Sequence, residues 1–122
     1  AEPGIGGLPW SALARGRLTR DWDDATARSE TDEFGRTLYD TSESDRVIAE
    51  RVAEIADARG VTRAQVALAW HFTKPVVTAP IVGATKLEHL DDAVAALDLD
   101  LTADEVARLE ERYVPHAVAG FA

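Results

Sequence analysis

The chain has 122 residues, is 46% hydrophobic, and carries 13 basic against 22 acidic residues, for a formal charge of −9. This length predicts one small domain with an ordinary core, and the acidic balance argues against nucleic acid or an anionic membrane surface as the partner. Because the chain has no cysteine, it has no disulfide framework and no thiolate site, which suits a reducing cytoplasm. No signal peptide or membrane span is recognisable, and the missing initiator methionine is an indication of a processed or truncated N-terminus.

The first part of the sequence predicts a strand and two loops. Residues 4–10, GIGGLPW, are short, apolar and bounded by glycine, as in a buried strand, and they lead into a small-residue loop at 11–18. Residues 19–43 are polar and rich in Asp, Glu, Ser and Thr without a sustained period. They predict a long surface loop.

Two helices are predicted next. Residues 44–60 have apolar side chains at helical spacing and end in Gly60, a typical helix stop. Thr62 and Gln65 then form a capping-box pattern that opens a second helix over 62–74. This second helix is apolar nearly all round, so we expect it to be deeply buried.

A second strand is predicted at residues 76–82, VVTAPIV. The run is β-branched with little alternation, as expected for a strand covered on both faces in a parallel sheet, and Pro80 should lie near its end because it cannot donate a ladder hydrogen bond. Two helices complete the chain. The first has an apolar face, and the second opens with a capping box at Thr102 and Glu105 and carries a stripe that runs to Tyr113. The apolar face of the first consists of Leu87, Leu90, Val94 and Leu97.

The order strand, loop, two helices, strand, helix, helix predicts an α/β fold with right-handed crossovers and a parallel sheet. Two parallel strands alone leave open edges, and isolated strand pairs are marginal in water. The two predicted strands therefore require further strands beside them to form a stable sheet.

Two turns are candidates for binding an anion. Residues 83–86 pass from the second strand into a helix, so they present unpaired N–H groups and the positive end of the helix dipole, with Lys86 as a cation. The alternative is a mere connection. In residues 9–16, PWSALARG, Trp10 offers a stacking surface and Arg15 a guanidinium, or else Trp10 is a core residue and Arg15 a solvated one.

Three segments, PWSALARGRL, RGVTRAQVALAW and PIVGATKLEHLDDAVAALDLDLT, resemble in order and spacing the C-terminal third of the aldo-keto reductases, which are NADP(H)-dependent oxidoreductases. The resemblance implies that residues 1–122 form the C-terminal part of a (β/α)₈ TIM barrel, with two parallel strands plus helices. They would comprise the seventh and eighth strands and helices and an additional C-terminal helix, with 19–43 as a long surface loop within this part.

The resemblance also implies the cofactor contacts of the first turn. Trp10 stands where the family stacks an aromatic ring on the nicotinamide. Two residues later, Ala12 stands where a proline is common in the family. The loop along the pyrophosphate and ribose corresponds to Ser11, Leu13, Arg15, Gly16 and Leu18.

For the second turn, the resemblance implies a site for the adenosine 2′-phosphate at Gly83, Ala84, Thr85 and Lys86. His89 replaces an arginine that many members have, and Asp92 stands where they often have a glutamate that contacts adenine. Ala93 replaces the usual asparagine and so weakens that contact. The expected preference for NADP(H) over NAD(H) depends on Lys86 and the helix N-terminus.

The family's catalytic tyrosine, lysine, aspartate and histidine come from strands one to five, and none of those motifs occurs here. No such set is expected to converge among the remaining candidates, so we expect no catalysis from this chain alone. These candidates are Tyr39, His71, Lys74, Tyr113 and His116. No metal-binding spacing occurs, and in the loop Trp22 or Phe34 either touches substrate or packs locally.

The sequence thus predicts the NADP(H)-binding portion of an enzyme that reduces an aldehyde or ketone to an alcohol. The alternative is a complete, non-catalytic nucleotide-binding or scaffolding module that self-associates through its open strands. Neither the carbonyl substrate nor the oligomeric state can be read from the sequence.

Overall fold

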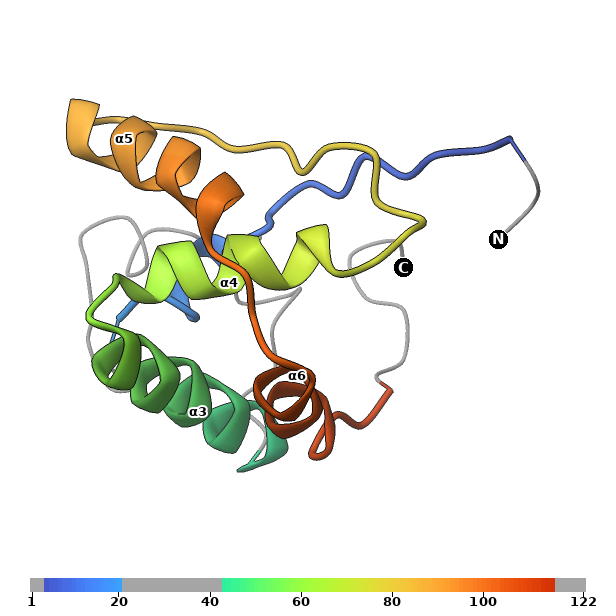
Figure 1. Cartoon of the computed structure of the whole chain (residues 1–122), viewed down its shortest axis with the longest axis vertical. Helices are drawn as coiled ribbons and strands as arrows, with labels where there is room; N and C mark the ends of the chain where they lie inside the picture. The colour runs from blue at the N-terminus through green and yellow to red at the C-terminus, as the bar shows by residue number, and fades with distance from the viewer. Residues whose placement is uncertain (1–3, 21–42, 116–122) are drawn as a thin grey trace, which may run out of the picture.

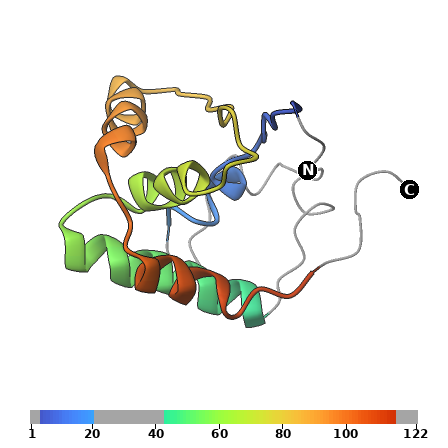
Figure 2. The ribbon, with the colours of Figure 1, turned by 45° about the vertical axis from the view of Figure 1, so that its right-hand side comes forward.

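The computed structural model describes residues 4–20 and 43–115. Figures 1 and 2 show helix α4 in the middle of the fold. Helices α3 and α6 lie on one side of it, and α5 with two extended segments lies on the other. The elements are η1 (Ala14–Gly16), α3 (Glu43–Arg59), α4 (Arg63–Phe72), α5 (Leu87–Ala95), η2 (Ala96–Asp98) and α6 (Ala103–Glu110). Most of the predicted loop at 19–43 lies outside the described residues.

The ends of the helices follow the local sequence. Gly60 ends α3 with a positive φ of 66°, and the amide of Val61 donates to the carbonyl of Ala56 at 3.0 Å, which is the six-to-one bond of a Schellman cap. The predicted glycine stop is confirmed. Because L side chains rarely adopt this backbone conformation, glycine is the residue type that ends the helix at little cost.

Both predicted capping boxes are confirmed. The Thr62 hydroxyl accepts from the Gln65 amide at 3.2 Å, and the Gln65 side chain accepts from the Thr62 amide at 2.9 Å. Thr102 and Glu105 make the same reciprocal pair at 3.1 and 2.8 Å. Each box satisfies two amides that the first turn of a helix leaves unpaired.

The prediction of strands at 4–10 and 76–82 is wrong for the described residues, which contain one isolated parallel bridge, between Gly7 and Val77. The Gly7 amide donates to Val76 at 2.6 Å, and the Gly7 carbonyl accepts from Thr78 at 2.8 Å. The predicted parallel direction is therefore confirmed. The ladder does not extend further because prolines in both segments lack an amide donor, and because a strand pair without further neighbours is marginal.

Helices α3 and α6 pack antiparallel, as Figure 2 shows. Along this contact three ion pairs connect α3 to α6 and its C-cap residue Glu111 in opposite order: Arg51 with Glu111, Glu54 with Arg108, and Arg59 with Glu105. Beneath these pairs lies a core cluster that α4 completes, formed by the buried side chains Val52, Ile55, Ala56, Val66 and Leu109.

The apolar face of α5 is not covered by the described residues. Leu87 is 74% exposed, and the other three residues of the predicted face, Leu90, Val94 and Leu97, are exposed as well. The small side chains of Ala93 and Ala96 instead pack toward Leu68 of α4. The amphipathic pattern is present, but its large apolar side chains face away from the core of the described chain.

Candidate functional site

The loop that follows the first extended segment has an unusual backbone. Ser11, Ala14 and Arg15 have φ values of 52°, 51° and 54°, a left-handed region that L residues rarely enter, and Gly16 follows at 94°. Each such non-glycine residue costs about 1 kcal/mol or more. Backbone of this kind persists only where surrounding contacts hold it, so those contacts define the site.

Internal hydrogen bonds close the loop on itself. The amides of Gly16 and Leu18 both donate to the Leu13 carbonyl, at 3.0 and 3.4 Å, and the Ala14 amide donates to Ser11 at 2.8 Å. In this conformation the amides of Gly16 and Leu18 are therefore occupied by the loop itself. Gly16 and Leu18, two of the predicted cofactor residues, therefore cannot offer these amides to a ligand.

Arg20 is a residue of this loop that sequence reasoning missed. Its guanidinium donates to the carbonyls of Arg15 and Gly16, at 3.3 and 3.4 Å, while its Nη1 atom is buried and has no hydrogen-bond partner among the described residues. The same guanidinium lies 2.2 Å from where a Cβ on Gly16 would stand. Gly16 thus leaves room for Arg20 to brace the left-handed turn.

Trp10 and Ala12 lie on either side of Ser11 but in different surroundings. Trp10 is 55% exposed, so the core reading of this tryptophan does not hold in the described chain. Ala12 is buried and packs with Leu68 and Ala96. Ala12 therefore anchors the loop in the core, while Trp10 presents its ring outward.

The second candidate turn, residues 83–86, is exposed throughout. Lys86 is the N-cap of α5 with extended backbone and makes no side-chain cap, so the predicted helix start is confirmed. Its Nζ atom lies 4.0 Å from the Glu88 carboxylate, and both side chains are mostly exposed. Glu88 already supplies a negative charge to the first turn of α5, and an anion bound there would compete with it for Lys86.

His89 and Asp92, the two remaining residues predicted from the resemblance, lie further along α5. The amide of His89 donates to the Lys86 carbonyl at 3.1 Å, which tightens the first turn of the helix. His89 is exposed and Asp92 is half-buried.

Shared packing relates the two candidate turns. The extended segments that precede them run parallel at Gly7 and Val77, and the Ile81 amide donates to the Pro9 carbonyl at 2.8 Å. Beyond this point Ala12 of the first loop and Ala96 of η2 meet on Leu68. The loop at 11–18 and the segment that begins at 83 thus both follow the bridged pair in the chain, from segments aligned in the same direction.

A cavity of about 670 Å³ lies beneath the first loop, between α3, α4 and α6. Four titratable side chains, those of His71, Lys74, Glu110 and Tyr113, line it together with Ser11 and mostly apolar residues. The expectation that no catalytic set of tyrosine, lysine, aspartate and histidine converges stays a prediction, since the acid in this cavity is a glutamate. Tyr113 also lies beyond the end of α6 at Glu110, not on the helix as predicted.

The contacts of this cluster are structural. Glu110 accepts a hydrogen bond from Trp70 Nε1 at 2.8 Å and a second from Lys74 Nζ, and Lys74 lies 5.1 Å from the centre of the Trp70 ring. The hydrogen bond from Lys74, followed by that from Trp70, holds the pKa of Glu110 below its usual range. Lysine and carboxylate thus neutralise each other.

His71 contacts the loop directly, since its Nε2 atom lies 3.2 Å from the carbonyl oxygen of Ala12. Its ring meets the Trp70 ring edge-on, at 5.2 Å between centroids. The side chain of His71 is half-buried. Sequence alone did not identify the partner, because Ala12 is 59 residues away.

Among residues 4–20 and 43–115, no group of three or more His, Cys, Asp or Glu side chains is placed to hold a metal ion. Nor is any helix of this described part long and apolar enough to cross a membrane. Four candidates named from the sequence, Trp22, Phe34, Tyr39 and His116, lie outside the described residues.

Comparison with known proteins identifies relatives over nearly the whole chain. Residues 1–113 match the Aldo/keto reductase family. The chain is 40% identical over 120 residues to versiconal hemiacetal acetate reductase of Aspergillus parasiticus, covering 96% of this chain and 35% of that protein. It is 42% identical over 121 residues to a putative aryl-alcohol dehydrogenase of Schizosaccharomyces pombe, covering 98% and 34%.

A further relative is the aldo-keto reductase dtxS3 of Metarhizium robertsii, 40% identical over 121 residues, with 96% of this chain and 32% of that protein covered. The chain therefore spans about a third of the length of these curated relatives. With the family matched over residues 1–113, the conclusion is direct: the chain belongs to the aldo/keto reductase family.

Proposed function

We propose that this chain is the cofactor-binding C-terminal portion, from strand seven to the end, of an NADP(H)-dependent aldo-keto reductase. The whole protein would have the (β/α)₈ barrel fold and reduce an aldehyde or ketone to an alcohol by hydride transfer. The names of the relatives, a reductase and an alcohol dehydrogenase, support this reaction class.

The observation that carries the proposal is the parallel bridge between Gly7 and Val77. In parallel pairing the carboxyl ends of both segments point toward the same edge, where barrel enzymes bind their ligands. The two segments lead into the loop at 11–18 and the turn at 83–86, which carry most of the candidate cofactor residues. This is the arrangement that a cofactor spanning two adjacent loops requires.

The uncovered apolar surface supports a barrel completed by other chain segments. Ile81 is 55% exposed, and Ile5 and Leu8 of the other extended segment are exposed as well, although all three have the character of buried strand residues. The apolar face of α5 is open in the same way. Additional strands beside the bridged pair would cover residues of this kind.

Within this proposal, each residue has a distinct role in holding the cofactor. The exposed ring of Trp10 would stack on the nicotinamide, and Lys86 with the first amides of α5 would bind the 2′-phosphate. Because the amides of Gly16 and Leu18 are engaged inside the loop, the pyrophosphate would use other groups of Ser11, Leu13 and Arg15. The remaining candidates are Gly83, Ala84, Thr85, His89 and Asp92.

The bound cofactor would supply the hydride, and the general acid would come from the rest of the protein. The contacts of Glu110, Lys74 and His71 support this division, because these side chains are engaged with each other and with the backbone. We therefore propose that the 122-residue chain alone is inactive. Titration with NADPH, followed by Trp10 fluorescence, should show weak or no binding.

The second candidate function is a complete module that self-associates and binds a nucleotide without catalysis. The exposed apolar residues favour this function, because a second copy of the chain would cover them. The mass of the native gene product separates the two functions. A single species of about 250 residues or more supports the reductase, whereas a 13.2 kDa species supports the module.

The direct test is Lys86→Ala in the full-length protein, with Arg112→Ala as a matched control that removes an exposed positive charge far from the turn in sequence. The lysine variant should raise the KM for NADPH more than the KM for NADH. The difference between the two effects should correspond to about 1.5–3 kcal/mol of binding free energy, which is typical of a charge-assisted hydrogen bond. The control should leave both unchanged. Equal effects of Lys86→Ala on the two cofactors would refute the 2′-phosphate assignment.

A further inference from the structure

The loop at 11–18 borders an open cavity, so only part of it packs against the described helices. Ser11, Ala12, Ala14 and Leu18 line one side of the cavity, and α3, α4 and α6 line the others. The loop also contains three non-glycine residues in the left-handed region. A strained segment beside an open cavity depends on polar contacts from other parts of the chain to keep one shape.

His71 supplies such a contact from α4. A carbonyl oxygen only accepts hydrogen bonds, so the 3.2 Å approach of Nε2 to the Ala12 carbonyl requires Nε2 to carry the proton. Ala12 is buried, while Ser11 before it and Ala14 after it have positive φ values. His71 therefore binds the loop at Ala12, between the two positions with a strained backbone.

The orientation of the His71 ring depends in turn on α6. Trp70 meets that ring edge-on, and the Trp70 indole is held by its hydrogen bond to Glu110 at 2.8 Å. Lys74, which lies just beyond the end of α4, bonds to the same carboxylate. Glu110, Trp70 and His71 thus form a continuous series of contacts from α6 to the Ala12 carbonyl.

We propose that His71, oriented by Trp70 and Glu110, is a positioning residue that holds the loop at 11–18 in its left-handed conformation. Its consequence for NADP(H) rests on the proposed function, whereas the effect on the loop does not. The hydrogen bond fixes the backbone between the exposed Trp10 ring and the turn at Arg15. Loss of the bond should loosen the loop without unfolding the α3–α6 core.

Amide hydrogen exchange of the 122-residue chain tests the proposal. The amides of Ala14, Gly16 and Leu18 are hydrogen-bonded inside the loop and so report its opening. His71→Leu should accelerate their exchange about fivefold, the worth of one neutral hydrogen bond. His71→Gln, which keeps a donor, should restore most of the protection, and the neighbouring, exposed Phe72→Leu should have no effect on the loop.

Glu110→Ala should accelerate the same amides about twofold, since it acts through Trp70. Unchanged loop exchange in His71→Leu would overturn the proposal, as would an equal acceleration of the core amides of Ile55 and Val66. No effect of Glu110→Ala would overturn the orienting role of α6.

The cofactor consequence is tested on the full-length reductase. His71→Leu should raise the KM for NADPH about fivefold while changing kcat less than twofold, and His71→Gln should restore it. If the unmodified full-length protein does not bind NADPH while the exchange results hold, the proposed function fails and the positioning role stands.

Discussion

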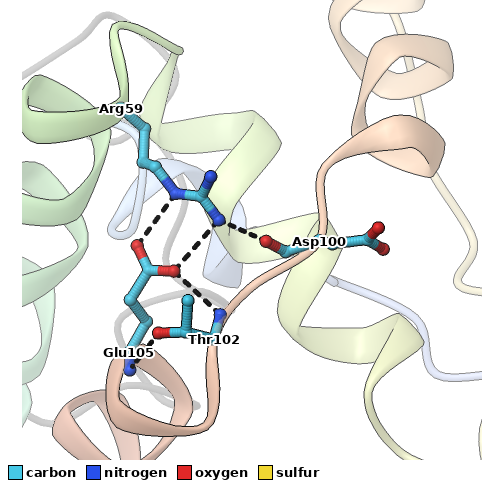
Figure 3. Close-up of polar contacts among 4 residues, drawn as sticks. All are labelled: Arg59, Asp100, Thr102 and Glu105. Atoms are coloured by element: carbon cyan, nitrogen blue, oxygen red, sulfur yellow. Dashed lines mark hydrogen bonds and ion pairs between the residues drawn. The ribbon is translucent and has the colours of Figure 1, made fainter.

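Glu105 accepts two hydrogen bonds from the guanidinium of Arg59, both at 3.0 Å, and so joins the first turn of α6 to the last turn of α3 (Figure 3). The same guanidinium donates to the Asp100 carbonyl, and the same carboxylate completes the capping box with Thr102. One ion pair thus contributes both to the start of a helix and to the contact between two helices.

The stability of the chain should fall in acid through this pair. The hydrogen bond from Arg59, followed by that from the Thr102 amide, lowers the pKa of Glu105 from its usual 4.5. A carboxylate with a depressed folded pKa stabilises the fold fully above its unfolded value and loses that contribution as pH falls through the folded one. Urea midpoints should therefore decline below pH 4.5, and the decline should be smaller in Glu105→Gln. Equal declines would contradict this assignment.

Arg59 and Glu105 should also be energetically coupled. A double-mutant cycle with Arg59→Met and Glu105→Gln should yield about 0.5–1 kcal/mol at low salt, toward the upper end for a partly exposed pair because the contact is bidentate. The pair Arg46 and Glu50 on the surface of α3, at 3.3 Å, provides the comparison and should yield less. If Arg59 and Glu105 are coupled no more strongly than Arg46 and Glu50, the bidentate geometry does not contribute to stability.

Both capping boxes should contribute measurably to stability. Thr62→Ala and Thr102→Ala should each lower the free energy of unfolding by about 1 kcal/mol, because each leaves an amide in the first helical turn without its acceptor. The matched Thr→Ser variants retain the hydroxyl and should stay within a few tenths of a kcal/mol of wild type. Denaturant titration measures both. Destabilisation by Ser as large as by Ala would indicate that the methyl group, not the cap, matters.

The buried core and the exposed face of α5 should respond differently to truncation. Ile55→Ala, at a side chain only 1% exposed, should cost about 2–5 kcal/mol. Leu87→Ala should cost less than about 0.5 kcal/mol in the 122-residue chain. In a longer protein whose other segments cover α5, Leu87→Ala should cost about 2 kcal/mol or more. The same small effect in both would argue against a covered face.

The bridge at Gly7 depends on a close approach beside it. A Cβ on Gly6 would lie 1.8 Å from the Thr78 hydroxyl, so Gly6→Ala should disturb the pairing. Exchange of the bridge amides of Gly7 and Thr78 should accelerate at least about threefold, and Thr78→Ala should suppress part of this effect when combined with Gly6→Ala. A double variant no better protected than the single one would exclude this contact as the cause.

Much of the helical structure could be predicted because its causes are local. The capping boxes at Thr62 and Thr102 and the stop at Gly60 each depend on residues within about one turn, and all three are present as predicted. The strands could not be predicted in the same way. Whether residues 76–82 form a ladder depends on neighbours for both edges, and the described residues provide one bridge.

The candidate site divides similarly. Its residue types and order along the chain were readable, and so was the resemblance to the aldo/keto reductase family, which matches over residues 1–113. The occupied amides of Gly16 and Leu18, the support from Arg20 and the hydrogen bond of His71 to Ala12 were not readable.

The sequence by itself determined where α4 and α6 begin, where α3 ends and which family the chain resembles, because caps, glycine stops and motifs are properties of short stretches of the chain. Only the tertiary structure decided that His71 meets Ala12, that Arg59 meets Glu105, and that the apolar face of α5 stays open. These contacts join residues far apart in the chain, and their formation depends on how whole helices pack, which no local pattern specifies.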